Sequence, residues 1–408
     1  MRIWIVTQYY PPEVGAAPVR LSRLARMLVA QGHDVTVVTA MPNYPDGVIN
    51  PPYRGRFAYS ETIDGVSVKR VWLYTSPSKR ARARIANQLS FMVTLALRGT
   101  FLKRPDVLLV ESHPLFVTIA TGWLRRIKRA PVVLNVSDLW PESAVATGML
   151  KADSVFVRMA WRVERWAYND SAHIVGMTQG VVDGILKVHR RADRVSLIAN
   201  AVDLEAFKPA GPEQRLAART SLGLPPDRFT AVHVGNMSLT YDFEVILGAA
   251  AALPDVTFAF AGGGSQAGRL AEQVALRKLD NVKLLGLLPH SQVPDVWAAG
   301  DVSMISLADS SLADGTRPAK MYESFAAGVP VVAAIRGEGA ELLDAAGGGI
   351  AVPVGGHEEF IAAIRRLQAS PDERNRMSED GRAFAVQNLS PDAVTSRYLA
   401  IMEQVVPS

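Results

Sequence analysis

The chain has 408 residues, of which 49% are hydrophobic and 20% are charged, a composition that excludes a disordered chain and predicts a globular protein. The length suffices for two or three domains, each with its own core. The sequence contains no cysteine, which excludes a disulfide framework and a thiolate metal site and fits a reducing compartment.

The first residues do not predict a secretory signal. Residues 3–7 form a short apolar run, and Pro11 and Pro12 follow soon after it, so this run is too short for the apolar part of a signal peptide. We therefore expect the protein in the cytoplasm.

The net charge of +5 is unevenly distributed along the chain. Residues 1–130 contain 19 Lys and Arg against 7 Asp and Glu, a charge of +12, whereas the remainder contains 25 against 32, a charge of −7. A basic N-terminal part in an otherwise acidic chain indicates an anionic partner, either a phospholipid surface or a nucleic acid.

The chain begins with a strand, a helix and a second strand. Residues 2–7 predict a buried strand, residues 18–31 an amphipathic helix that ends at Gly32, and residues 34–39 a parallel strand. In a doubly wound sheet the loop after the first strand lies over the carboxyl edge, where ligands bind. The loop formed by residues 8–17 is therefore a candidate ligand contact, although its glycine has the alternative role of turning the chain.

Residues 40–78 are rich in proline, glycine and aromatic residues. An exposed loop of this composition on the ligand side of the sheet would recognise an acceptor. A packed excursion with a hairpin at residues 63–66 explains the same composition equally well.

Residues 79–104 predict a basic helix. Arg80, Arg82 and Arg84 precede an apolar run over residues 85–97, which is too short to cross a bilayer because a crossing needs about twenty residues. Such a helix can lie on an anionic membrane surface. It can equally be a helix of the domain with a solvated basic end.

Ionisable residues follow two further predicted strands. His113 comes after the strand over residues 106–110, and Asp138 and Glu142 come after the strand over residues 131–136. Because neighbouring parallel strands end at one edge of the sheet, these side chains are candidates for contact with a substrate. The alternative is that they cap helices or turns.

The rest of the first domain and the linker are recognisable from their patterns. A helix over residues 153–169 and strands over residues 173–178 and 194–198 complete the first domain. Residues 208–226 form a polar, proline-containing linker with a short helix.

The second domain begins with a strand that ends in Gly235, and the following loop again offers N–H groups to phosphate. A strand over residues 258–261 leads into three glycines, residues 262–264, whose spacing fits a dinucleotide fingerprint. The next strand, residues 282–285, ends at Gly286 without the acid that a nicotinamide dinucleotide's ribose needs. A nicotinamide site is therefore not expected.

Residues 314–334 predict a loop, a helix of about two turns and a buried strand. Lys320 lies in the first turn of that helix, and Glu323 lies one turn later on the same face. The helix N-terminus, together with Arg317 and Lys320, suits a diphosphate, and Glu323 suits a ribose diol. The alternative is an ordinary surface ion pair.

The Lys-x-x-Glu pattern at residues 320–323, followed by Gly-x-Pro-Val-Val at residues 328–332, resembles the nucleotide-sugar signature of the family 4 retaining glycosyltransferases. The string Asp-Leu-Trp-Pro-Glu-Ser at residues 138–143 is similar to the branch that builds bacterial O-antigen, capsule and colanic-acid-like polymers. The resemblance implies the α/β GT-B fold, in which two doubly wound Rossmann-like domains face a cleft. It places the domains at residues 1–203 and 204–387, with residues 388–408 as a helix that packs back on the first.

The resemblance also implies which residues form the site. The catalytic group would be Asp138, Arg317 and Lys320, whose cations stabilise the departing diphosphate without a metal or another cofactor. The donor contacts would be Gly15, Gly235, Asn236, Gly263, Leu288, Pro289, Lys320, Met321 and Glu323. The acceptor contacts would be Arg20, His113 and Glu142.

Several positions differ from the commonest family pattern, among them Ala16 for a Gly and Ser137 for a His. Gly315 stands where the family has a further Glu, eight residues before Glu323. Asn236 and Tyr241 stand where the family often has an Arg and a Lys that bind the donor phosphates. The differences leave the diphosphate mainly to Arg317 and Lys320.

The resemblance implies transfer of an N-acetylated or deoxy hexose from a UDP-sugar to a lipid-diphosphate-linked saccharide in surface polysaccharide synthesis. It implies a cytoplasmic enzyme that is peripheral on the inner face of the cell membrane through residues 79–104, with no nucleic acid partner. Two alternatives stay open, namely a UDP-sugar epimerase of the same fold and a non-catalytic module that binds an anionic surface.

Overall fold

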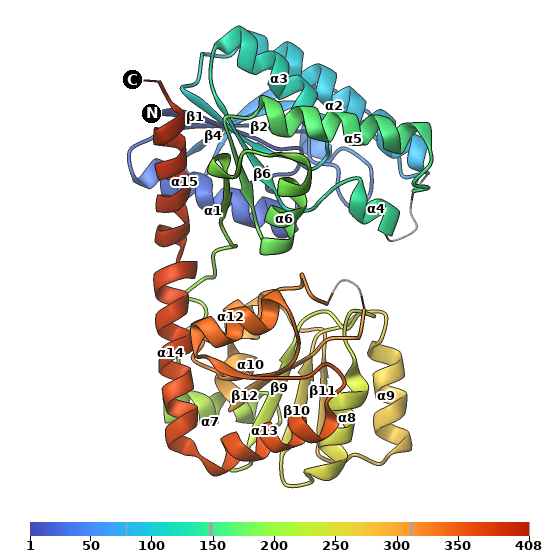
Figure 1. The fold of residues 1–408 in the computed structure, drawn as a ribbon, viewed down its shortest axis with the longest axis vertical. Coiled ribbons are helices and arrows are strands. Elements are labelled where there is room, and N and C mark those ends of the chain that lie inside the picture. Colours follow the sequence, from blue (N-terminus) through green and yellow to red (C-terminus); the bar gives the residue numbers. More distant parts are fainter. Residues whose placement is uncertain (79, 147–149, 311–312, 408) are drawn as a thin grey trace. The chain divides into compact units, whose positions relative to one another are not determined.

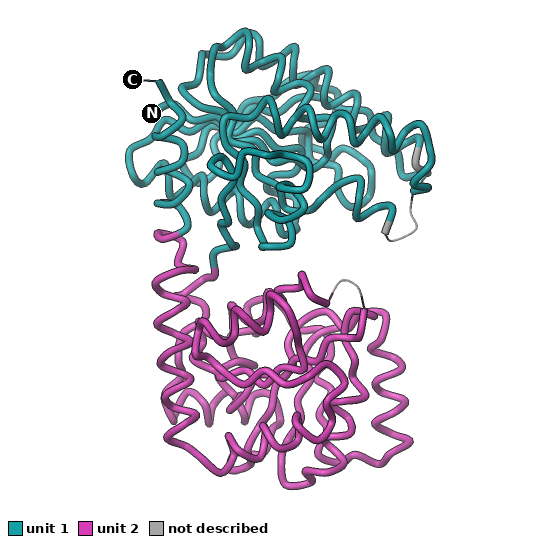
Figure 2. The backbone as a smooth tube through the Cα atoms, viewed as in Figure 1, with its two compact units in different colours: residues 1–201, 394–408 teal, residues 202–393 magenta. Residues whose placement is uncertain are grey.

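The computed structural model describes residues 1–78, 80–146, 150–310 and 313–407 (Figure 1). The chain divides into two compact units, coloured separately in Figure 2. Unit 1 comprises residues 1–201 and 394–408, and unit 2 comprises residues 202–393. Each unit has a sheet of mainly parallel strands with helices on its faces, which confirms the predicted fold class.

The sheet of unit 1 has the strand order β3-β4-β2-β1-β5-β6-β7-β8. Its strands are β1 (Arg2–Val6), β2 (Asp34–Ala40), β3 (Ala58–Ile63), β4 (Val66–Val71), β5 (Val107–Glu111), β6 (Val132–Val136), β7 (His173–Gly176) and β8 (Val195–Leu197). The strands β5 and β6 at the centre are mostly apolar because both of their faces are buried, and their only polar residues are Glu111 and Asn135 near their carboxyl ends. The strand order reverses direction between β1 and β5, which is where a doubly wound sheet binds ligands.

The strand β3 pairs antiparallel with β4 and forms the edge of the sheet. The turn between them has positive φ at Asp64 (49°) and Gly65 (80°), as a two-residue hairpin turn requires. Residues 40–78 therefore contain the packed hairpin that was one of the two predicted alternatives.

Helices cover both faces of the unit 1 sheet. They are α1 (Ala16–Ala30), α2 (Ala81–Phe101), α3 (Val117–Lys128), α4 (Glu142–Ala146), α5 (Val155–Asp170), α6 (Gln179–Val188) and most of α15 (Pro391–Val405), with short 3-10 turns at Pro51–Tyr53 and Ala192–Arg194. Apolar residues of α2, α3 and α5 pack into one core, and those of α1 and α15 pack into another. These two cores lie on opposite faces of the sheet.

The C-terminal helix α15 belongs mainly to unit 1. Tyr398 is buried there and donates a hydrogen bond from its hydroxyl to Oδ1 of Asn135 at 2.6 Å. Residues 388–393 stay in unit 2, where the N–H of Val202 donates to the carbonyl of Leu389 at 2.8 Å. The return to unit 1 thus begins at residue 394, six residues after the predicted position, and the other boundary falls after residue 201 rather than 203.

The sheet of unit 2 has the strand order β11-β10-β9-β12-β13-β14, with parallel neighbours. Its strands are β9 (Thr230–Val234), β10 (Thr257–Ala261), β11 (Val282–Gly286), β12 (Val302–Ser306), β13 (Val331–Ala334) and β14 (Gly349–Val352). Its helices are α7 (Pro212–Ser221), α8 (Phe243–Ala252), α9 (Ala267–Leu276), α10 (Val293–Ala299), α11 (Ala319–Ala326), α12 (Glu338–Ala346), α13 (His357–Ala369) and α14 (Pro371–Leu389), with a 3-10 turn at His290–Gln292. This is the Rossmann strand order, and its switch point lies between β9 and β12.

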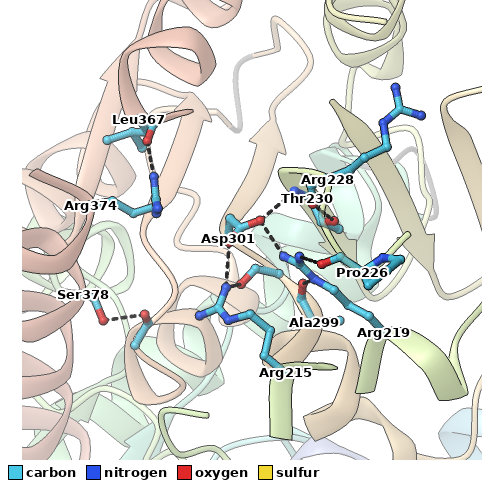
Figure 3. Close-up of polar contacts among 12 residues, drawn as sticks. Arg215, Arg219, Pro226, Arg228, Thr230, Ala299, Asp301, Leu367, Arg374 and Ser378 are labelled. Atoms are coloured by element: carbon cyan, nitrogen blue, oxygen red, sulfur yellow. Dashed lines mark hydrogen bonds and ion pairs between the residues drawn. The ribbon is translucent and has the colours of Figure 1, made fainter. Parts of the chain in front are cut away.

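Asp301, directly before β12, fixes the amino end of this sheet. Figure 3 shows Arg215 and Arg219 converging on its carboxylate, at 2.7 and 2.6 Å. The same carboxylate accepts the N–H of Thr230 at the start of β9, at 2.7 Å. The contacts tie α7, β9 and β12 together at the end of the sheet opposite the carboxyl edge.

Candidate active site

The loops at the carboxyl edge of the unit 2 sheet lie against one another. The N–H of Gly235 donates to the carbonyl of Ala261 at 2.8 Å, and the N–H of Met237 donates to the carbonyl of Gly263 at 2.7 Å. Gly262 has φ +140°, and a Cβ there would clash with the carbonyl oxygen of Gly235. The structure therefore brings the predicted donor residues Gly235 and Gly263 together, and glycine is needed for this close approach.

Helix α11 begins at Ala319, directly after Pro318, so Lys320 and Met321 lie in its first turn as predicted. Lys320 is 7% exposed and Met321 is fully buried. The side chain of Met321 fills the core, so a donor phosphate can meet this residue only through its backbone N–H. The N-terminus of α11, which carries the partial positive charge of the helix dipole, lies at the same carboxyl edge of the sheet as Gly235.

The ammonium of Lys320 lies directly below Gly235. Its Nζ is 2.9 Å from Nε2 of His233 and 4.0 Å from the ring centroid of Tyr241. A Cβ at Gly235 would lie 3.9 Å from the same Nζ. Burial lowers the pKa of Lys320 to about 7, against the opposing charge of Glu323. An anion bound at this loop would therefore favour protonation of Lys320.

Glu323 lies one turn after Lys320 and is held by Trp297, whose indole Nε1 donates to Oε2 at 3.2 Å. Burial raises the pKa of Glu323, whereas the indole hydrogen bond and the charge of His290 lower it. His290 directly follows the predicted donor contacts Leu288 and Pro289 in the chain. The arrangement suits a ribose diol beside a nucleobase.

Arg317 is paired with an acid that the sequence did not suggest. Its Nε lies 2.8 Å from Oε2 of Glu338, with an N–H that is not aligned for a hydrogen bond, and both side chains are about nine-tenths buried. Glu338 reaches this position because its N–H donates to the carbonyl of Asp314 at 2.8 Å. A Cβ at Gly315 would lie 3.7 Å from Oε1 of Glu338. A carboxylate from α12 therefore lies beside the position where the family pattern has its further Glu.

Arg336 anchors the loop that leads into α11. Its guanidinium contacts Oδ1 of Asp314 at 2.8 Å, Oδ1 of Asp309 at 2.6 Å and the carbonyl of Ser310 at 3.0 Å. The two carboxylates raise the pKa of Arg336. These contacts hold the loop on both sides of residues 311–312. Those two residues lie outside the part of the chain that the structure describes.

Asn236, another predicted donor contact, is exposed on this edge. Gly264 has φ +144°, and a Cβ there would clash with Oδ1 of Asn236 and with the carbonyl of Met237. Because residue 264 has no Cβ, the Asn236 amide can approach the loop after β10 closely. Asn236 offers hydrogen bonds at the position where the family often has an Arg, but it adds no charge.

In unit 1 the predicted acceptor contact Arg20 is committed to a buried network. Glu111, at the end of β5, accepts from Arg20 Nη2 at 2.6 Å, from Ser137 Oγ at 2.6 Å and from Asn135 Nδ2 at 2.8 Å. Only 13% of the Arg20 side chain is exposed. Arg20 therefore supports the carboxyl ends of β5 and β6, and Gly15 lies exposed just before it at the start of α1.

The other predicted residues of unit 1 are exposed. Asp138 accepts a hydrogen bond from Ser143 Oγ at 2.6 Å, a contact between two side chains that links it to the first turn of α4. His113 and Asp138 line one small recess, whereas Glu142 lies outside it in the first turn of α4. Asp138 thus both supports α4 and presents its carboxylate at the recess.

Sequence reasoning missed two residues of this recess. Glu164 and Tyr168 lie four residues apart on α5, and the Tyr168 hydroxyl donates to Glu164 Oε1 at 2.8 Å. Burial raises the pKa of Glu164 to about 7, and the hydrogen bond from Tyr168 opposes that rise. Two polar residues at this spacing on the inner face of an amphipathic helix were the available signal.

Across the described ranges, no three or more His, Asp or Glu side chains are grouped as metal ligands would be. The same part of the chain contains no helix long and apolar enough to cross a membrane. Independence of a metal or cofactor stays a prediction.

The two units correspond to two known domain families. Residues 15–201 match the family model described as a glycosyl transferase 4-like domain, and residues 214–384 match the glycosyl transferases group 1. The chain therefore belongs to the glycosyltransferases with the GT-B fold, as its motifs predicted.

The chain is similar to individual bacterial glycosyltransferases. The chain is 23% identical to the putative colanic acid biosynthesis glycosyl transferase WcaI of Escherichia coli (strain K12), over 98% of this chain and 99% of that protein. It is 27% identical to the probable glycosyltransferase WbjE of Pseudomonas aeruginosa, over 64% of each chain.

Solved structures share the fold over nearly the whole chain. Anabaena HepE in complex with UDP has a TM-score of 0.74 at 18% identity, covering 99% of this chain and 100% of its own. WaaG, a glycosyltransferase involved in lipopolysaccharide biosynthesis, has a TM-score of 0.65 at 16% identity, covering 97% and 99%.

Proposed function

We propose that the protein is a retaining glycosyltransferase that moves a sugar from a UDP-sugar to a lipid-diphosphate-linked saccharide during bacterial surface polysaccharide assembly. The observation that carries the proposal is the Lys320 ammonium buried below Gly235 at the N-terminus of α11, with Glu323 one turn away. UDP in the HepE complex supports the donor class. The names of WcaI and WaaG support surface polysaccharide assembly, as O-antigen, capsule or exopolysaccharide.

The proposed chemistry is electrostatic. As the bond between the sugar and UDP breaks, negative charge builds up on the diphosphate, and Lys320, Arg317 and the N-terminus of α11 stabilise it. The diphosphate raises the pKa of Lys320, so UDP binding draws a proton onto this side chain. Charge neutralisation by these side chains removes the need for a metal ion. Attack from the face of the leaving diphosphate gives retention, and no covalent nucleophile is assigned.

The acceptor is proposed to bind unit 1 through the exposed side chains of His113 and Glu142, because the recess beside His113 has a volume of only about 10 Å³ and is too small for a sugar. Carboxylates and imidazoles form hydrogen bonds with sugar hydroxyls. Asp138 and Gly15 remain proposed contacts to the donor from this unit. An N-acetylated or deoxy hexose is the proposed sugar.

The proposed membrane partner rests on the exposed face of α2. Leu89, Val93, Leu97 and Phe101 repeat every four residues and are 38%, 49%, 53% and 82% exposed. Helix α3 packs beside α2 and exposes a second apolar row, consisting of Ile119, Trp123 and Ile127. An apolar stripe with a basic end fits an anionic bilayer surface, and we place the enzyme on the cytoplasmic face of the cell membrane.

Arginines 80, 82 and 84 at the start of α2 are exposed, while Lys79 lies outside the described residues. Replacing these three arginines by glutamine should abolish flotation with phosphatidylglycerol vesicles and leave UDP binding intact. The matched control replaces Lys208, Arg269 and Lys278, which are exposed in unit 2. Equal flotation of both triple variants would remove the membrane partner from the proposal.

The decisive experiment measures UDP release from a panel of UDP-sugars, with and without lipid-diphosphate saccharides. A transferase releases UDP in proportion to acceptor and forms a lengthened glycolipid of retained anomeric configuration. Release that needs no acceptor would favour an epimerase of the same fold. Absence of any UDP-induced thermal stabilisation would favour a non-catalytic module and refute the proposal.

A further inference from the structure

His233 occupies an unusual place for a polar residue. It is the fourth of the five residues of β9, which lies between β10 and β12, and it has no exposed surface. The rings of Tyr241, Phe243 and Phe260 surround it at centroid distances of 5.5, 5.2 and 5.8 Å. An apolar side chain would fill this space without the free-energy cost of burying an imidazole. The hydrogen bonds of the ring must therefore explain why a histidine occupies this position.

The two ring nitrogens of His233 have different partners. Nδ1 lies 3.2 Å from the carbonyl oxygen of Met304 on β12, and a carbonyl only accepts, so we assign the proton to Nδ1. Nε2 is then the acceptor for the Lys320 ammonium at 2.9 Å. Burial and the charge of Lys320 hold the pKa of His233 well below its usual value, which keeps the ring neutral. The sheet backbone thus fixes the ring, and the ring fixes the lysine.

We propose that His233 is a positioning residue for donor binding, which holds the Lys320 ammonium under Gly235 before the diphosphate arrives. The inference rests on the proposed function, because it takes Lys320 to be a diphosphate contact. Tyr241 completes the arrangement, since its ring covers the ammonium at 4.0 Å.

The need for positioning follows from the sequence of this site. The family often supplies an Arg and a Lys at the positions of Asn236 and Tyr241, whereas Lys320 here carries the interaction with less help. A lysine has a flexible four-carbon stem, and ordering it at the moment of binding weakens affinity. A lysine that is already held in place avoids that loss.

The test compares three variants of the full chain that separate the two hydrogen bonds of the ring. In His233→Gln the side-chain amide reaches the position of Nε2 and still accepts from Lys320. In His233→Asn the amide reaches only the position of Nδ1 and keeps the bond to Met304. In His233→Phe the shape remains and both bonds are lost.

The readout is the dissociation constant of UDP, measured by calorimetry at pH 7. We expect His233→Gln to stay close to the wild type, and His233→Asn and His233→Phe to bind about tenfold more weakly or worse. In a Lys320→Met background, His233→Asn should cause no further loss, because the lysine that it serves is gone.

Equal affinity of the Asn and Gln variants would overturn the inference, since the bond to Met304 would then suffice. Unchanged affinity in all three variants would overturn it as well. If His233→Phe does not fold, as judged by circular dichroism, the comparison of Gln with Asn still decides the question. Failure of the wild type to bind UDP is a different result, because it would sink the proposed function itself.

Discussion

Replacing Lys320 by methionine should stabilise unit 2 while it weakens UDP binding to a level that calorimetry can still measure. Burial lowers the pKa of Lys320 from 10.5 to about 7, and at neutral pH a shift of this size corresponds to roughly 4 kcal/mol of unfavourable free energy. Methionine fills a similar volume without a charge. The variant leaves His233 Nε2 without a donor, which costs about 1–3 kcal/mol. The net expectation is a gain of about 1–3 kcal/mol at pH 7.

The pH dependence of this gain has a definite sign. Between pH 7 and 10.5 the unfolded chain still holds the proton of Lys320 while the folded unit has released it, so wild-type stability rises with pH. The advantage of Lys320→Met should therefore be largest below pH 7. It should shrink by about 1.4 kcal/mol per pH unit above that, so the net gain should vanish between about pH 8 and pH 9, and the wild type should be the more stable protein at higher pH.

The assay is chemical and thermal unfolding at several pH values from 6 to about 10, with and without UDP. Lys208→Met is the matched control, because Lys208 is an exposed lysine of the same unit. UDP at about 100 times its dissociation constant should add about 2.7 kcal/mol to the wild type and to the control, and far less to Lys320→Met. A Lys320→Met variant that is less stable than the wild type at pH 7, or that keeps UDP stabilisation, would refute the reasoning.

Three further predictions concern the same unit. UDP affinity should fall by up to about tenfold per pH unit above pH 7, because Lys320 then loses its proton in the free protein. Calorimetry at pH 7 and pH 9 checks this, and an affinity that does not change with pH would contradict it. Glu338→Gln leaves the charge of Arg317 buried without a counter-charge, so the free energy of unfolding should drop by about 3–5 kcal/mol and UDP should recover part of the loss. An unchanged midpoint of denaturation would contradict it. Asp301→Asn removes the carboxylate that pairs with Arg219 at the opposite end of the sheet, so the free energy of unfolding should fall by about 3 kcal/mol. The UDP dissociation constant should stay unchanged. Denaturation and calorimetry measure the two quantities, and weaker UDP binding would contradict the prediction.

Much of the fold was predictable from local patterns. The helix with Lys320 and Glu323 begins at Ala319 and ends at Ala326, within the two turns expected. The strand β10 begins at residue 257, one residue earlier than predicted, and ends at residue 261 as predicted, because an apolar run that leads into glycines marks a buried strand. The residues Asp64 and Gly65 predict a hairpin turn, but only the structure decided between a hairpin and an exposed loop.

By itself the sequence determined the order of strands and helices, the class of fold and the position of the Lys320 helix, since each depends on residues near one another in the chain. Only the tertiary structure decided the partners of the charges. Arg317 meets Glu338 of another helix, Lys320 meets His233, and Arg20 meets Glu111. The physical reason is that the free energy of a buried charge depends on which groups the sheet order brings within about 3 Å, and that order joins residues separated by 21, 87 and 91 positions.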